Sequence, residues 1–184
     1  HTHIRRVSVS SLLRTQFEWF YPLSEQHQIQ FKIDAPKELY WNTDSVYFKK
    51  ILANLISNAF KYTEDGGTVR ISLHEEENFL VLKVYNTGKG IEEADMQNIF
   101  DRYRILGTMD NDDNRQNTAR NGLGLFICHS LVQSLGGRID IESEVGQYAE
   151  FTVTLPFGIV EESSDDTIDE DIPVSLPSPN TDIQ

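Results

Sequence analysis

Apolar residues recur at helical spacing in three long stretches of the chain. Pro22 lies inside the first of them and is expected to kink or divide it, because proline lacks the backbone N–H that an interior helix position needs. A shorter stretch, residues 92–100, has the same spacing. Long helices are therefore predicted over residues 8–26, from about Asp44 or Ser45 to Tyr62, and from near Gly122 to the Gly136-Gly137 pair.

Other stretches alternate apolar and polar residues with a period of two, which is typical of strands with one buried face. They cover residues 28–33, 68–74, 79–85, 138–144 and 150–155, with a shorter one at 39–41. The order of elements has hairpins rather than regular strand–helix–strand units. It predicts an α/β (α+β) two-layer sandwich, with a mixed, mostly antiparallel sheet of about five strands packed against three main helices.

Composition and charge divide the chain into a body and a tail. The sequence has 184 residues, 39% of them hydrophobic, and a net charge of −13. Residues 159–184 hold eight acidic residues and no Lys or Arg, while 21 acidic and 16 basic residues give residues 1–158 a net charge of −5. We expect one domain over 1–158 and an acidic flexible tail or linker over 159–184. An acidic body also disfavours nucleic acid as a partner.

The remaining composition adds two expectations. The one cysteine, Cys128, lies in an apolar run and is interpreted as a small buried hydrophobe rather than a reactive thiol. No stretch is long and apolar enough for a membrane helix. Residues 107–121 are polar and aperiodic, which predicts a long loop, and loops of this length in compact domains often act as lids.

The second predicted helix carries a polar stripe beside its apolar face. Asn54, Asn58 and Lys61 are spaced i, i+4 and i+7, so at about 100° per residue they lie within about 60° of one another. Solvent exposure is the ordinary explanation of such a stripe. The alternative is a ligand site, because amide oxygens suit Mg²⁺, a lysine can meet a phosphate, and Tyr62 can lie against a ring or sugar.

Two glycine segments add to this pattern. Asn86-Thr87-Gly88-Lys89-Gly90 follows a predicted strand, and Asn121-Gly122-Leu123-Gly124-Leu125 opens the third predicted helix. Glycines before a helix let backbone N–H groups approach an anion at the positive end of the helix dipole. A plain turn would explain either segment alone, and the dinucleotide spacing G-x-G-x-x-G is absent from both.

Taken together, these segments resemble the sequence boxes of sensor histidine kinases. KKILANLISNAFKYTEDGG is similar to the N box, VYNTGKGI to the first glycine box, NIFDRY to the F box, NGLGLFICHSLVQSLGG to the second glycine box and SEVGQYAEFTVTLP to the last strand pair. The resemblance covers roughly residues 10–157. It implies the catalytic and ATP-binding domain of a kinase, with the Bergerat fold shared by gyrase, Hsp90 and MutL.

The resemblance also implies roles for individual residues. Asn58 matches the Mg²⁺ ligand and Asn54 its neighbour in the metal site, at a place where related ATPases carry a water-activating Glu. Lys61 matches a residue near phosphate and Tyr62 one near the nucleotide, and residues 103–121 match the ATP lid. The remaining positions that match nucleotide-binding residues are Asn86, Gly88, Gly90, Arg120, Gly122, Leu123, Gly124 and Leu125.

The sequence departs from the family pattern at three positions. Asn86 stands where the family has an Asp that accepts from the adenine amino group. Ala149 stands where the last strand pair has a hydroxyl, and Arg120 where the second glycine box often has its first glycine. An amide can still accept from adenine and donate to it, but without charge assistance. We therefore predict weakened nucleotide binding.

Two classes of function remain open from the sequence. In the first, the domain uses ATP and Mg²⁺ to phosphorylate a histidine on an upstream dimerisation domain, from which a response regulator receiver domain takes the phosphoryl group. In the second, it is a degenerate kinase domain that signals by docking. None of the five histidines lies in a phosphoacceptor pattern. The family context implies a homodimeric parent and a cytoplasmic domain of a membrane-anchored bacterial sensor.

Overall fold

The computed structural model describes residues 1–100 and 115–161, with side chains described for 1–100 and 124–161. The expected tail beyond residue 161 and residues 103–114 of the expected lid lie outside the described residues. The elements are β1 (Arg5–Ser8), α1 (Val9–Gln26), β2 (Gln30–Asp34), β3 (Tyr40–Thr43), α2 (Ser45–Tyr62), β4 (Thr68–Glu76), β5 (Phe79–Thr87), α3 (Glu93–Met96), α4 (Arg115–Ser134), β6 (Arg138–Glu144) and β7 (Tyr148–Pro156).

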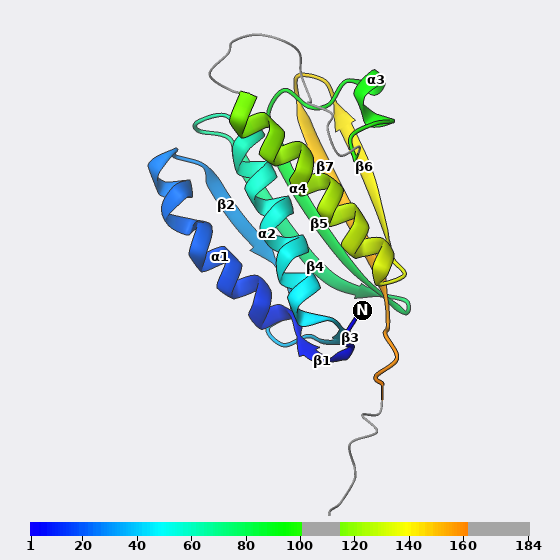
Figure 1. Ribbon diagram of the computed structural model, residues 1–184. Coiled ribbons are helices and arrows are strands. Elements are labelled where there is room, and N and C mark those ends of the chain that lie inside the picture. Colours follow the sequence, from blue (N-terminus) through cyan, green and yellow to red (C-terminus); the bar gives the residue numbers. More distant parts are fainter. Residues whose placement is uncertain (101–114, 162–184) are drawn as a thin grey trace, which may run out of the picture.

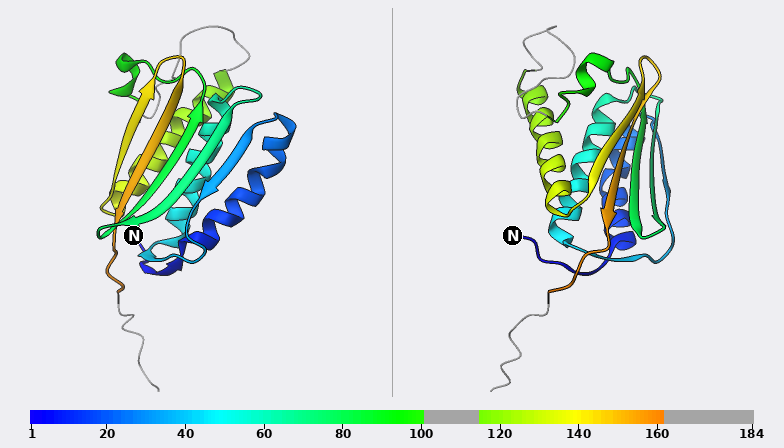
Figure 2. Two further views of the ribbon diagram at one scale, coloured as in Figure 1. Left: turned by 180° about the vertical axis from the view of Figure 1, so that it is seen from behind. Right: turned by 90° about the vertical axis from the view of Figure 1, so that its right-hand side faces the viewer.

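The described strands form a five-stranded sheet in the order β2-β4-β5-β7-β6, together with a small sheet of β1 and β3. In the large sheet β2 runs parallel to β4, and every other neighbouring pair is antiparallel. Helices α1, α2 and α4 lie side by side on one face of it (Figures 1 and 2). The predicted two-layer sandwich with a mixed, mostly antiparallel sheet is confirmed. The short strand predicted at 39–41 is present as β3, but β1 and its pairing with β3 were not predicted.

Helix α2 fills the middle of the helical layer. Its N-cap, Asp44, accepts backbone hydrogen bonds through Oδ1 from Val46 (3.0 Å) and Tyr47 (3.1 Å). The predicted apolar face is confirmed, because all its members are 0–2% exposed. They are Ile51, Leu52, Leu55, Ile56 and Ala59. The sheet-facing burial of these side chains fixes the helix against β5, as expected for an amphipathic helix.

Of the predicted helices, the one over residues 8–26 is confirmed as α1, and the predicted start of the third is wrong. Pro22 does not divide α1, which continues to Gln26. Pro22 lies on the exposed side, where the carbonyl that loses its helical partner can bond to water instead. Helix α4 begins at Arg115, not near Gly122. Adding residues to an existing helix costs little, so a helix anchored by buried residues can extend into a polar sequence that has no apolar stripe.

The shorter elements also differ from their predicted bounds. Helix α3 covers Glu93–Met96, and turns follow it, so the helix predicted over 92–100 is much shorter. Cys128 is fully buried, as expected, and burial raises the pKa of its thiol to about 12. No helix within the described residues is both long and apolar enough to cross a bilayer.

The N-terminal segment and the end of β7 meet at one end of the molecule. The indole N–H of Trp41 in β3 donates to the carbonyl of Pro156 at 2.9 Å, and the backbone N–H of Gly158 donates to the carbonyl of Asn42 at 2.9 Å. The β5–α3 connection and the β6–β7 turn lie at the opposite end, beside the start of α4 (Figure 1). The two glycine segments are therefore remote from the N-terminus.

Replacing Asp44 with alanine tests how strongly α2 depends on its cap. Asp44→Ala removes the acceptor for Val46 and Tyr47, and we expect the free energy of unfolding to fall by about 1–2 kcal/mol in urea titrations. Asp44→Asn is the control, because asparagine caps a helix about as well. Equal stability of the alanine variant and the wild type would contradict the assignment of Asp44 as the cap.

Candidate functional site

The polar stripe on α2 includes an amide buried next to the core. Asn58 is only 6% exposed, Asn54 is half-buried and Lys61 is exposed. Among the described residues the Asn58 Oδ1 is buried without a hydrogen-bond partner. Native proteins rarely leave a buried acceptor unsatisfied, since this costs about 1–3 kcal/mol. Solvent exposure thus does not account for Asn58, and an amide oxygen is a ligand that suits Mg²⁺.

Lys61 and Tyr62 follow Asn58 at the end of α2. The Lys61 Nζ lies 5.7 Å from the centroid of the Tyr62 ring. Partial burial lowers the pKa of the Lys61 ammonium from its usual value, so the charged form is less favoured there than in water. An anionic group beside Lys61 would favour the charged form. The stripe therefore places the amide oxygen of Asn58 and the ammonium group of Lys61 within one helical turn of each other.

Asn86 lies within β5 rather than in the loop after it. Its side chain is 2% exposed, and its Nδ2 donates to the carbonyl of Thr87 at 3.1 Å. Across the ladder Asn86 pairs with Ala149 of β7. The two departures from the family pattern are thus direct neighbours in the sheet.

The first glycine segment passes through a narrow space. Gly88 has φ +151°, and a Cβ there would collide with the carbonyl oxygen of Tyr62. Gly90 has φ +67°, and its Cβ would lie 2.5 Å from the carbonyl oxygen of Glu144. Other residue types would clash at both positions. These glycines let the segment pass between the end of α2 and the β6–β7 hairpin.

The second glycine segment differs from its expected geometry. Gly122 and Gly124 lie inside α4, so the prediction that they open a helix and offer its free N–H groups to an anion is wrong. The cause is the N-terminal extension of α4 to Arg115. Gly124 does lie against the stripe, since its Cβ would be 3.6 Å from Asn54 Oδ1.

The other predicted residues of the second segment have different placements. Leu125 is 2% exposed and belongs to the hydrophobic core, which makes it a packing residue. Arg120 and Leu123 lie in α4, and their side chains lie outside the described part of the chain. On the side of the site formed by α4, the structure therefore brings Gly124 together with Asn54 of α2.

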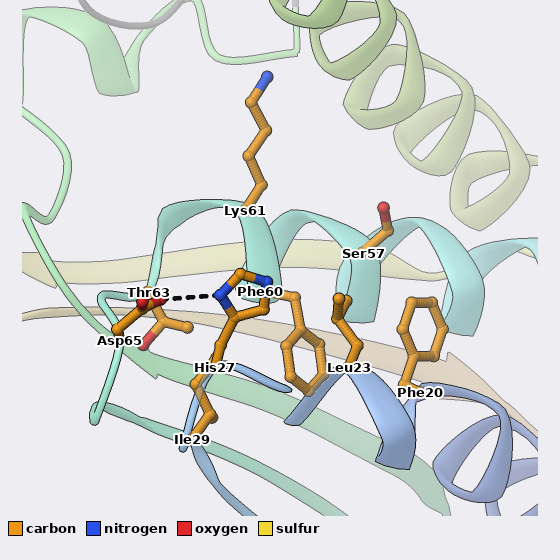
Figure 3. A pocket seen from close by; sticks show the side chains of 9 residues that line it. All are labelled: Phe20, Leu23, His27, Ile29, Ser57, Phe60, Lys61, Thr63 and Asp65. Atoms are coloured by element: carbon orange, nitrogen blue, oxygen red, sulfur yellow. Dashed lines mark hydrogen bonds and ion pairs between the residues drawn. The ribbon is translucent and has the colours of Figure 1, made fainter. Parts of the chain in front are cut away.

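A separate groove of about 380 Å³ lies between α1 and α2 (Figure 3). Its lining includes Phe20, Leu23 and Phe60, and the ion pair between His27 Nδ1 and Asp65 Oδ1 (2.9 Å) lies at its edge. Lys61 borders it, but its side chain extends away from the other labelled residues (Figure 3). Neither glycine segment nor Asn58 lines this groove, so it is distinct from the candidate site.

The β6–β7 hairpin, expected from the resemblance as the last strand pair, is joined to the first glycine segment by contacts that the sequence did not predict. Backbone bonds join Gly88 N–H to the carbonyl of Gln147 (3.2 Å) and Gly146 N–H to the carbonyl of Lys89 (2.7 Å). Ser143 Oγ accepts from the backbone N–H of Ile91 at 2.7 Å. A serine in an alternating strand carries no local signal for such a contact, so only the folded structure identifies it.

Residues 43–159 match the family described as "Histidine kinase-, DNA gyrase B-, and HSP90-like ATPase". This match covers more than half of the chain, and the chain therefore belongs to that family. Its relatives place it on the histidine kinase side of the family. They include the sensor protein SrrB of Staphylococcus aureus, 36% identical over 120 residues, or 65% of this chain and 20% of SrrB. The chain spans about a fifth of the length of these curated relatives.

Solved structures agree with this assignment. The nucleotide-free catalytic domain of histidine kinase ThkA has a TM-score of 0.72 at 23% identity, over 85% of this chain and 97% of that one. Full-length ShkA in complex with AMPPNP has a TM-score of 0.71 at 26% identity, over 86% of this chain and 32% of that one. The fold is that of histidine kinase catalytic domains, an ATP-binding class.

The orphaned oxygen of Asn58 leads to a stability prediction. Asn58→Leu replaces a buried, unsatisfied amide with an apolar side chain of similar size, so the free energy of unfolding should rise by about 1 kcal/mol in urea titrations. Asn54→Leu is the matched control one turn earlier, where the amide is half-buried and the change should stay within about 0.5 kcal/mol. A destabilised Asn58→Leu variant would mean that the Asn58 amide is satisfied in the free protein.

Proposed function

We propose that this domain binds ATP with Mg²⁺ and transfers the γ-phosphoryl group to a histidine on a dimerisation domain of the same parent protein. The observation that carries the proposal is the buried Oδ1 of Asn58, which has no partner in the described part of the chain and lies within one turn of Lys61. A hard cation would satisfy this oxygen, and a phosphate chain would accompany the cation. Membership of an ATPase family supports the same ligand.

Each end of the nucleotide has proposed residues. Asn58, with Asn54 beside it, holds the cation, Lys61 meets the phosphates and Tyr62 lies near the nucleotide. The Asn86 amide forms hydrogen bonds with adenine, and Gly88 and Gly90 allow the adjacent segment to approach closely. The bound Mg²⁺ would supply neutralisation of phosphate charge. The chain's own contribution is to position the groups, and this is what phosphoryl transfer mainly requires.

Residues of α4 complete the proposed site. Gly124 lies against Asn54, which supports a nucleotide contact from this part of α4. Arg120, Gly122 and Leu123 precede it on the same helix and stay proposed nucleotide-binding residues. Leu125 acts through packing, because it is buried in the core beneath them.

Asn54 favours a kinase over an ATPase within this family. An amide does not take up a proton at neutral pH, so Asn54 cannot act as a general base that activates water. ATP would then persist in the site until an acceptor histidine arrives. This matches the sensor protein relatives and disfavours an Hsp90-like hydrolytic cycle.

The proposed partners follow from the same class. They are a phosphoacceptor dimerisation domain, a response regulator receiver domain and a second copy of the parent chain. One similar structure is described as histidine kinase ThkA in complex with response regulator TrrA, which supports a receiver domain as a partner here. A membrane-anchored bacterial sensor, with this domain in the cytoplasm, is the proposed setting. Residues 159–184 are proposed to be a flexible tail or linker beyond the domain.

A docking module with a vestigial site is the second candidate. Two observations favour it: one donor of the Asn86 amide is already bound to the carbonyl of Thr87, and its cross-strand neighbour Ala149 offers no hydroxyl. Both features would weaken binding of the adenine ring, and neither alters the residues of α2 proposed to hold the cation. The two candidates therefore differ in a measurable quantity, the affinity for Mg²⁺ and ATP.

Calorimetric titration of the full chain with ATP separates the two candidates. We expect saturable binding that weakens strongly when EDTA removes Mg²⁺, because the cation joins Asn58 to the phosphates. Asn58→Leu should lose the Mg²⁺-dependent part of the affinity. Absence of binding at millimolar ATP, with Mg²⁺ present, would support the docking module instead.

Asn86→Asp tests the adenine end. A carboxylate restores the charge-assisted hydrogen bond, worth about 1–2 kcal/mol, so the affinity for ATP should rise by about five- to thirtyfold. Asn86→Ala is the matched control and should bind more weakly than the wild type. If the aspartate, asparagine and alanine forms bind equally, adenine does not contact residue 86.

A further inference from the structure

Ser143 lies on the helix-facing side of the sheet, at the same end as the candidate site. It follows Ile139 and Ile141 on β6, whose side chains pack against the core. Across the ladder Ser143 pairs with Ala149, and Ala149 pairs with Asn86. One row of three neighbouring strands thus carries Asn86, Ala149 and Ser143, and Ser143 has a hydroxyl on the strand position directly paired with Ala149.

The Ser143 hydroxyl joins two segments that are far apart in sequence. It accepts from the backbone N–H of Ile91 at 2.7 Å and donates to the carbonyl of Tyr148 at 2.7 Å. These bonds use its one donor and one of its acceptor sites. The segment after β5 is thereby fastened to the β6–β7 hairpin.

Backbone contacts hold the same segment alongside the Ser143 bond. Gly88 N–H and Gly146 N–H bond to carbonyls across the gap, at 3.2 and 2.7 Å. Gly90 lies so close that a Cβ on it would be 2.8 Å from Ser143 Oγ. Among these contacts Ser143 contributes the side-chain bond, which a substitution can remove without changing the backbone.

The fastened segment also touches α2 on its other side. A Cβ on Gly88 would collide with the carbonyl oxygen of Tyr62, so the segment lies directly against the end of the helix that carries Asn58 and Lys61. The segment therefore lies between this helix end and the β6–β7 hairpin. A shift of the segment away from the hairpin would move it against the end of α2.

We propose that Ser143 is a positioning residue of the nucleotide site, whose hydroxyl holds the Gly88–Ile91 segment in its binding conformation before the nucleotide arrives. This inference rests on the proposed function, since it assigns Ser143 to the same site. A segment held in place in the free protein loses less freedom on binding, and the affinity is higher for that reason. Ser143 itself touches no reacting atom.

Amide hydrogen exchange in the nucleotide-free full chain tests the fastening. In Ser143→Ala the Ile91 amide should exchange about fivefold faster than in the wild type, as the loss of one hydrogen bond implies. Ser143→Thr keeps the hydroxyl and should restore slow exchange. Ser134→Ala is the matched control, since it removes a hydroxyl that donates to the carbonyl of Ser130 near the other end of α4. Unchanged exchange at Ile91 in Ser143→Ala would overturn the proposal.

Titration of the same variants with ATP and Mg²⁺ tests the link to binding. The dissociation constant should rise about fivefold in Ser143→Ala and recover in Ser143→Thr, with the unfolding midpoints of all variants measured alongside. Faster exchange with an unchanged dissociation constant would overturn the positioning role. If the wild type does not bind ATP at all, the proposed function fails, and the positioning role fails with it whatever the exchange rates show about the fastening.

Discussion

The packing of α2 on the sheet is the constraint on which the site depends. Its apolar face is buried almost completely, and Asp44 fixes its N-terminus. The same burial draws Asn58 below the surface and leaves its carbonyl oxygen without a partner among the described residues. An unsatisfied acceptor costs about 1–3 kcal/mol, which the surrounding hydrophobic burial offsets. The fold thus keeps this acceptor unsatisfied at the expense of its own stability, and in the proposed function a cation would satisfy it.

Three segments distant in sequence meet at the end of this helix. They are the C-terminal turn of α2, the segment after β5 and the β6–β7 hairpin, and the sheet brings them to one end of the molecule (Figure 1). Glycines at 88 and 90 permit the close approach, and hydrogen bonds to the hairpin hold it. Changes on the hairpin can therefore alter the site without touching a ligand. Under the proposed function, Asn86 and Ala149 would weaken only the adenine end of the site.

Much of the fold could be predicted because its elements have strong local patterns. The apolar stripe of α2 and the alternation in β4, β5 and β7 each reflect one buried face. The short strand expected at 39–41 corresponds to β3, whereas β1 escaped prediction because four residues are too few for a clear period. The start of α4 escaped it because a helix can extend through a polar sequence once its buried part is formed.

Some residues of the candidate site could likewise be predicted from local patterns, and others could not. Asn54, Asn58 and Lys61 could be predicted because helical spacing alone places them on one stripe. Ser143 could not, because its partner Ile91 lies 52 residues earlier and meets it only through strand pairing. The expectation that Gly122 opens a helix and offers its free N–H groups to an anion was wrong, because a local glycine pattern does not say where a helix begins.

In the proposed function the Asn58 carbonyl binds the cation that accompanies the nucleotide, and NMR can follow this amide directly. The full chain, labelled with ¹⁵N, would be titrated with AMPPNP in the presence and absence of Mg²⁺ while the Asn58 side-chain amide signals are recorded. We expect a saturable shift of these signals when Mg²⁺ is present and a much smaller one in its absence. Saturable nucleotide binding elsewhere in the spectrum, with the Asn58 amide signals unchanged by Mg²⁺, would contradict it.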